Sequence, residues 1–293
     1  MTRLYEFAEH PDLESPALIV SLEGWIDAGG AAARATGAVL EGVEATPVVE
    51  FDADALLDHR SRRPVMRLDD GMNLGLTWPS IRIMAFSDSV GNDALILVGA
   101  EPDHQWRAFT HAVVDLAMEL GVRMVVGLGA YPAPVPHTRP SLLATTATDP
   151  QLRDQLAQVR SSIEVPASIG NAIEERCKEV GLPAVGIWAQ VPHYAAAMPY
   201  PAAALSLVEG LNEVTGLSIA TGTLAEEADA TRARLDDLVA DSAEHLALLR
   251  QLEARADAAG AAAPGGPTQA ADLPSGDELA SEIERFLREQ GDR

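Results

Sequence analysis

The feature that most constrains the fold is an apolar strand that runs into a glycine turn and then into a helix. The stretch 17–22 (Ala-Leu-Ile-Val-Ser-Leu) has the length and composition of a buried strand. Glu-Gly-Trp-Ile-Asp-Ala-Gly-Gly follows at 23–30, and the alanine-rich residues 28–41 predict a helix that Gly42 ends. In an open α/β sheet, the carboxyl ends of strands and the amino ends of helices meet at such turns, where ligand sites form. The segment therefore predicts an α/β protein.

Further strands and helices alternate along the chain. Strands are predicted at 46–51, 94–98, 124–128 and 184–189, and helices at 104–120 with Asp103 as N-cap, after Asp149-Pro150, and at 202–214. In residues 62–86, apolar and polar residues alternate on either side of an Asp69-Asp70-Gly71 turn, and this pattern favours antiparallel strands. A Pro-rich loop is expected from Tyr131 to Pro140. The pattern predicts a mostly parallel sheet flanked by helices, with an antiparallel extension.

Helical patterns replace this alternation from about residue 225. Heptad a and d positions are occupied by Ala228, Thr231, Leu235, Leu238, Ser242, His245, Leu249 and Leu252. Because polar residues interrupt this series, a helix packed on its own domain or on a sister subunit fits better than a long isolated coiled coil. We divide the chain into an α/β domain (1–224), a helical extension (225–259), an Ala/Gly/Pro-rich flexible linker (260–274) and a C-terminal amphipathic helix (275–293). That last helix docks on its own core or on a partner.

Composition narrows the function classes. The formal net charge is −23, and a surface that acidic repels phosphate backbones and anionic lipids. We therefore expect no nucleic-acid or membrane partner. No run approaches the ~18 apolar residues of a membrane span, and no signal-peptide pattern opens the chain, so we expect a cytoplasmic protein. Cys177 is the only cysteine, which excludes an internal disulfide, and its helical spacing from Ile173 and Val180 predicts a buried, inert thiol.

Four segments follow predicted strand ends, at 23–30, 99–104, 130–139 and 190–200. Because the carboxyl ends of parallel strands share one edge of a sheet, we expect their side chains to gather near one cleft. The candidate cleft residues are Glu23, Trp25, Asp27, Gly29, Gly30, Glu101, Asp103, His137, Arg139, His193 and Tyr194.

Two interpretations of these residues stay open. Glu23 and Asp27 have the chemistry of paired carboxylates for acid–base work, and Arg139 or the N–H groups of Gly29-Gly30 suit an anion. In the simpler interpretation, Asp27 caps its helix, the glycines allow close packing, and the prolines shape loops.

Catalytic signatures are absent from the sequence. It has no Gly-x-Ser-x-Gly elbow, no Gly-x-Gly-x-x-Gly after the first strand, and only one lysine, Lys178, which no glycine-rich run precedes. His137 and His193 are metal-ligand types but lie far apart in the sequence. We therefore assign no catalytic residue and expect no metal and no cofactor.

Several short motifs together resemble a known family. They are Leu4-Tyr5-Glu6-Phe7, Glu23-Gly24-Trp25-Ile26-Asp27-Ala28-Gly29, Gly99-Ala100-Glu101-Pro102-Asp103 with Trp106, Gly127-Leu128-Gly129-Ala130-Tyr131-Pro132, His137-Thr138-Arg139-Pro140, and Val191-Pro192-His193-Tyr194 with Pro199 and Pro201. In this order and spacing, from Leu4 to about Gly222, they resemble the PAC2 family of proteasome assembly chaperone 2-like proteins, in its actinobacterial branch.

The resemblance implies an α/β fold similar to purine nucleoside phosphorylases, self-association, and a role in protein assembly or interaction. It supplies no agreed catalytic residues. Proteasome-docking members of the wider family end in a hydrophobic residue, a tyrosine and any residue. This chain ends Gly291-Asp292-Arg293, which argues against direct docking on a proteasome through the C-terminus.

Two functions from different classes follow. The first is a non-catalytic, homo-oligomeric assembly protein, a trimer by analogy with the fold, with a protein partner that the sequence does not name. The alternative is a small-molecule enzyme or sensor on a phosphorylase-like fold, which binds a nucleoside or another phosphate-bearing ligand in the cleft.

Overall fold

An eight-stranded sheet forms the centre of the protein. The computed structural model describes residues 4–24, 26–155 and 164–261. The strand order is β1-β3-β6-β7-β2-β8-β10-β9. The strands of this sheet are β1 (Tyr5–Phe7), β2 (Ala17–Glu23), β3 (Thr46–Phe51), β6 (Ile81–Ser87), β7 (Asp93–Ala100), β8 (Met124–Ala133), β9 (Leu143–Ala147) and β10 (Ala184–Pro192).

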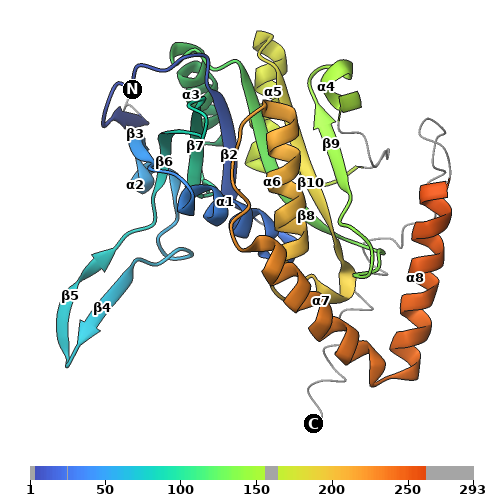
Figure 1. Ribbon diagram of the computed structural model, residues 1–293. Coiled ribbons are helices and arrows are strands. Elements are labelled where there is room, and N and C mark those ends of the chain that lie inside the picture. The colour runs from blue at the N-terminus through green and yellow to red at the C-terminus, as the bar shows by residue number, and fades with distance from the viewer. Residues whose placement is uncertain (1–3, 25, 156–163, 262–293) are drawn as a thin grey trace.

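Helices cover both faces of this sheet (Figure 1). One face carries α1 (Ala31–Glu41) and α6 (Pro201–Thr215), and the other carries α3 (Trp106–Glu119) and α5 (Ile169–Val180). The short helices are η1 (Ala28–Gly30), α2 (Ala53–Leu56), α4 (Pro150–Gln155) and η2 (His193–Ala195). Among the described residues, no helix is both long and apolar enough to cross a membrane.

The α/β fold class is confirmed, with parallel strands in the middle of the sheet and antiparallel strands towards both ends. β7, β2, β8 and β10 pair in parallel, whereas β1, β3, β6 and β9 pair antiparallel to their neighbours. The connection between β6 and β7 is a short turn, which only an antiparallel pair allows. The central strands are joined through helices, as parallel strands require.

Strand β2 is buried on both of its faces. Ala17 and Ile19 pack in the cluster that contains α1 and α6, and Leu18 and Val20 pack in the cluster that contains α3 and α5. Each of these four side chains is at most 4% exposed. This two-sided burial explains why the stretch is continuously apolar rather than alternating.

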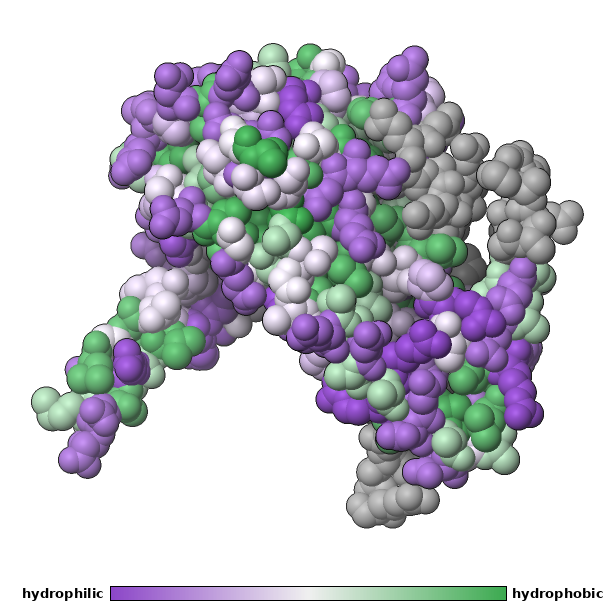
Figure 2. Space-filling model, in the orientation of Figure 1, coloured by the Kyte–Doolittle hydropathy of each residue, from purple (hydrophilic) through white to green (hydrophobic). Residues whose placement is uncertain are grey.

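A separate two-stranded hairpin projects from the body. It consists of β4 (Val65–Asp69) and β5 (Met72–Thr77), and all its residues are exposed. The predicted antiparallel pair is confirmed, but it forms a sheet of its own, and β6 is the strand of this region that extends the main sheet. The turn residues Asp70 and Gly71 have φ angles of 44° and 78°, the left-handed geometry of a tight hairpin turn. Figure 1 shows the hairpin extending away from the sheet, and Figure 2 shows that its surface is largely apolar.

Two helices follow the α/β core. α7 (Leu224–Ala240) packs against α6 with Leu224, Thr231 and Leu235 buried, and α8 (Ala243–Ala261) turns back from it. The heptad series is divided at Asp241 and Ser242, between the two helices. α8 reaches Ala261, and the rest of the expected linker and the helix expected at 275–293 lie outside the described residues.

Two local predictions are wrong. Asp103 is not the N-cap of α3, because that position is taken by Gln105, and the N–H groups of Asp103 and His104 bond to the carbonyl of Leu56. The loop expected to begin at Tyr131 begins after Ala133, since β8 pairs with β10 as far as Pro192↔Ala133. The elements β1, α2 and β9 were not predicted from the sequence, because three to five residues are too few to show a period.

Candidate functional site

The side chains of the four strand-end segments fall into separate groups. In the first, Asp27 Oδ1 and Oδ2 accept hydrogen bonds from the N–H groups of Ala32 (2.8 Å) and Ala33 (3.0 Å) in the first turn of α1. These donors have no partner within the helix, so the carboxylate satisfies them. This is the geometry of the simpler interpretation, in which Asp27 holds its own helix.

Of the two glycines of the turn, Gly29 allows a close approach, whereas a Cβ on Gly30 would meet no atom within 4 Å. Gly29 has a φ of +65°, and a Cβ atom there would lie 2.6 Å from the Cβ of Tyr200. Its N–H donates to the carbonyl of Ala196, and its carbonyl accepts from the N–H of Tyr200. Gly30, with a φ of +58°, directly precedes α1. The backbone at Gly29 is therefore tied to the segment that leads into α6.

A second group joins the Pro-rich loop to α7. The OH of Tyr194 accepts from the backbone N–H of His137 (2.8 Å) and lies 2.7 Å from His137 Nδ1. His137 Nε2 lies 3.1 Å from Asp236 Oδ1 on α7. His137 is 4% exposed, and burial raises the pKa of Tyr194. His193 packs edge-on against the Tyr194 ring, with centroids 5.3 Å apart.

Arg139 lies beside this group and binds carboxylates of α8. Its Nε and Nη2 donate to the two carboxylate oxygens of Asp257 at 2.8 and 2.9 Å, and Glu253 lies 3.6 Å from its Nη1. The hydrogen bond to Asp257 raises the pKa of Arg139 and lowers that of Asp257. Arg139 thus holds an anion by the fork geometry expected from the sequence, but the anion belongs to its own chain.

Two other candidates, Glu23 and Asp103, stand apart from these groups. Glu23 is exposed, and its carbonyl accepts from the N–H of Glu101 (3.0 Å). Asp103 Oδ2 accepts from the N–H of Asp58 (2.8 Å), near the root of the hairpin. Trp25 lies outside the described residues.

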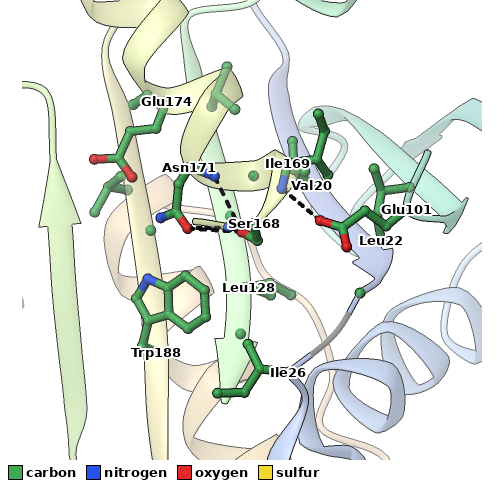
Figure 3. A pocket seen from close by; sticks show the side chains of 18 residues that line it. Val20, Leu22, Ile26, Glu101, Leu128, Ser168, Ile169, Asn171, Glu174 and Trp188 are labelled. Carbon is green, nitrogen blue, oxygen red and sulfur yellow. Dashed lines mark hydrogen bonds between the residues drawn. The ribbon is translucent and has the colours of Figure 1, made fainter. Parts of the chain in front are cut away.

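A cavity lies between the sheet and the amino end of α5 (Figure 3). Its volume is about 50 Å³, whereas one water needs roughly 10–15 Å³. Glu101, at 7% exposure, lines it and accepts from the N–H of Ile169 at 2.7 Å, at the start of α5. The polar lining is completed by Ser168, Asn171, Glu174 and Trp188.

Sequence reasoning found Glu101 but missed the other polar residues of this cavity. Trp188 stands in the mainly apolar stretch 184–189 of β10, which is typical of a core strand. Asn171 and Glu174 belong to a helix whose start is marked only by the Ser168 cap. Asp236, Glu253 and Asp257 were also missed, because acidic residues on acidic helices carry no distinguishing signal. Within the described ranges, no group of three or more metal-ligating side chains occurs.

The fold and the motifs define an α/β protein of the PAC2 class. The PAC2 family model matches residues 21–239, and the chain belongs to this family. A comparison with curated proteins gives no match.

Solved structures agree with this membership. A Mycobacterium tuberculosis protein of unknown function is 36% identical, with a TM-score of 0.81, over 88% of this chain and 90% of that one. A Corynebacterium glutamicum protein of unknown function is 30% identical, with a TM-score of 0.82, over 87% of this chain and 97% of that one. A Mycobacterium tuberculosis proteasome-assembly chaperone homologue is 31% identical, with a TM-score of 0.74, over 80% of this chain and 99% of that one.

Proposed function

We propose that this chain is a cytoplasmic homo-oligomer with a chaperone-like role in protein assembly. The family membership supports this proposal, as does the 31% identity to a protein described as a proteasome-assembly chaperone homologue. The observation that carries it is the hairpin β4–β5. A role in binding nucleic acid is disfavoured by the net charge of −23.

The hairpin has a large exposed apolar surface, which is unfavourable for a two-stranded ribbon that contacts only water. Its apolar side chains are between 48% and 69% exposed: Val65, Met66, Leu68, Met72, Leu74, Leu76 and the adjoining Trp78. None of them belongs to either of the two core clusters. Isolated hairpins are marginally stable in water, and contiguous exposed apolar patches mark interaction sites. The hairpin therefore requires a partner surface.

A second copy of the chain is the partner that charge favours. Three exposed arginines of the hairpin and the segment before it (Arg60, Arg63 and Arg67) outnumber its two exposed carboxylates (Asp69 and Asp70), while the chain as a whole is strongly acidic. A slightly basic, apolar arm is complementary to the acidic body of another copy. The trimer expected from the fold is the stoichiometry to test.

The alternative function, an enzyme or sensor for a phosphate-bearing ligand, has less support. Arg139 is occupied by Asp257, and the cavity at α5 presents the carboxyl groups of Glu101 and Glu174, with no basic side chain among the described residues that line it. A phosphate would be repelled there.

The test is the mass of the full chain in solution, measured by light scattering after size exclusion. Met66 and Leu76 are opposite one another in the hairpin, so Met66→Glu/Leu76→Glu places two like charges in the apolar surface. We expect the wild type at a multiple of 31.0 kDa and the double variant at the monomer mass. The control is Val90→Glu/Met118→Glu, which makes the same change at exposed sites, 70% and 55%, outside the hairpin.

The melting temperature supplies a second measurement. Self-association makes it rise with protein concentration, whereas a monomer melts at a constant temperature. A wild type that is monomeric, or a double variant that still associates, contradicts the proposal. The assembly role is tested by capture of client polypeptides from cells, which the wild type should achieve and the hairpin variant should lose.

A further inference from the structure

We propose that the cavity beside α5 binds a small uncharged molecule with a planar amide edge, a C=O next to an N–H. This site is separate from the hairpin and does not depend on the assembly role. It is built from a glycine-lined floor, two side-chain donors and one carboxyl acceptor.

Glycines on β8 and β10 make the space. The ring of Trp188 lies across Gly129, where a Cβ atom would come within 2.4 Å of it. A Cβ on Gly186 would meet Thr146 Oγ1 at 2.5 Å. A side chain at Gly129 would displace the ring of Trp188 from the cavity wall, and one at Gly186 would displace Thr146, which donates to Glu174.

Trp188 presents a donor without a partner. Its Nε1 atom is buried and makes no hydrogen bond to the described protein. A buried N–H without an acceptor costs about 1–3 kcal/mol, so the indole favours an acceptor that the described residues do not supply. A carbonyl oxygen in the cavity meets this requirement.

Asn171 supplies a second donor with a fixed orientation. Its Oδ1 accepts from both the N–H and the hydroxyl of Ser168, as part of the capping box of α5. Because the oxygen is used by the cap, the NH₂ group points the other way. Figure 3 shows that group on the same side of the cavity as the indole nitrogen of Trp188 and the carboxyl of Glu174.

Glu174 supplies an acceptor beside these donors. Burial raises the pKa of Glu174, and the hydroxyl of Thr146, which donates to Oε2 at 2.6 Å, opposes that shift. Trp188 Nε1 and Glu174 Oε2 lie 2.9 and 3.2 Å from one point, the position of a Cβ on Gly186. One donor and one acceptor therefore border the same space above Gly186, beside the hydroxyl of Thr146.

The charge of the lining selects a neutral ligand. Glu101 and Glu174 repel an anion, and the lining has no arginine, lysine or histidine among its described residues. A cation would pair with the carboxyls but would leave the donors of Trp188 and Asn171 without an acceptor. The rest of the ligand would contact the apolar side chains of Ile26 and Leu128.

Three isosteric probes test this inference on the full chain: benzamide (neutral), benzoate (anion) and benzamidine (cation). With ¹⁵N-labelled protein, the indole N–H resonance of Trp188 is identified by its loss in Trp188→Phe. We expect benzamide to shift that resonance and to bind at least about tenfold more tightly than either charged probe.

Calorimetric titration of variants then tests the hydrogen bond to the C=O of the amide and the hydrogen bond from its N–H separately. Trp188→Phe keeps a ring but removes the donor, and Glu174→Ala removes the acceptor, so each should weaken benzamide binding about tenfold. Trp106→Phe, at a tryptophan outside the cavity whose Nε1 donates to the carbonyl of Pro102, should bind as the wild type does. Circular dichroism confirms that each variant is folded.

Three results overturn the inference. One is tighter binding of benzamidine or benzoate than of benzamide. Another is unchanged benzamide affinity in Trp188→Phe. The third is the absence of any shift of the Trp188 resonance up to about 10 mM benzamide, which would mean that the cavity holds only water.

Discussion

At the scale of single residues, the side chains that resemble ligand-binding groups mostly bind their own chain. The OH of Tyr194 accepts from the N–H of His137 and lies 2.7 Å from His137 Nδ1. His137 Nε2 lies 3.1 Å from Asp236 Oδ1. These contacts link the Pro-rich loop to α7.

Tyr194→Phe should destabilise the protein by about 1–3 kcal/mol, because the backbone N–H of buried His137 loses its acceptor. Urea unfolding at neutral pH measures this free energy. The control is Tyr131→Phe, which removes an OH that accepts from the side chain of Gln190 and leaves no backbone group unpaired. Equal losses in the two variants would contradict the role assigned to Tyr194.

At the scale of elements, α8 is held to the Pro-rich loop by polar contacts. Arg139 binds Asp257 through two hydrogen bonds, and Thr138 donates to Glu253 at 2.7 Å. Leu252 is the one apolar residue of the described part of α8 that is fully buried. A helix attached mainly by exposed ion pairs opens more easily than one attached by a core.

Arg139→Ala should therefore release α8 without unfolding the sheet. Hydrogen exchange is expected to accelerate in 243–259 and to remain unchanged in β2 and β8. Arg176→Ala is the matched control, since Arg176 pairs with Glu179 within a single helix, at 2.8 Å. Unchanged exchange in α8 would show that Leu252 and its neighbours hold the helix alone.

At the scale of the whole molecule, one carboxylate connects distant parts of the chain. Asp88 follows β6 and accepts from the N–H groups of Val90, Asn92 and Ser218. Burial alone would raise its pKa, but the hydrogen bonds from Asn92, Ser218 and Val90 lower it to about 2. Asp88 therefore ties the β6–β7 turn to the segment after α6.

When folding lowers the pKa of a carboxyl group, the ionised group stabilises the folded protein at any pH above its unfolded-state pKa. That stabilisation is lost as the pH falls from the unfolded-state pKa through the folded-state pKa. For Asp88 that window runs from about pH 4 to pH 2, and it involves about 2 kcal/mol. Urea unfolding between pH 5 and pH 2.5 should show the wild type losing more stability than Asp88→Asn. The exposed-site variant Asp229→Asn should follow the wild type, and parallel curves for all three would refute the assignment.

The strands and helices that could be predicted are those whose signals are local. The apolar run of β2, the Asp-Gly turn of the hairpin and the helical spacing of α3 each lie within one element, and the structure contains all three. Asp103 failed as a cap because the carbonyl of Leu56, in a different element, bonds to its N–H. The family could be recognised for the same reason, since its motifs are short and ordered along the chain.

The sequence by itself determined the α/β class, the antiparallel hairpin and the family, because periodicity and glycine turns act over a few residues. Only the tertiary structure decided the partners of polar side chains. Arg139 meets Asp257 across 118 positions of sequence, and the hydroxyl of Thr146 meets Glu174 across 28. Such pairs depend on how helices pack on the sheet. In the described part of the chain, that packing gives the Glu174 carboxylate a hydrogen-bond partner and leaves the indole N–H of Trp188 without one.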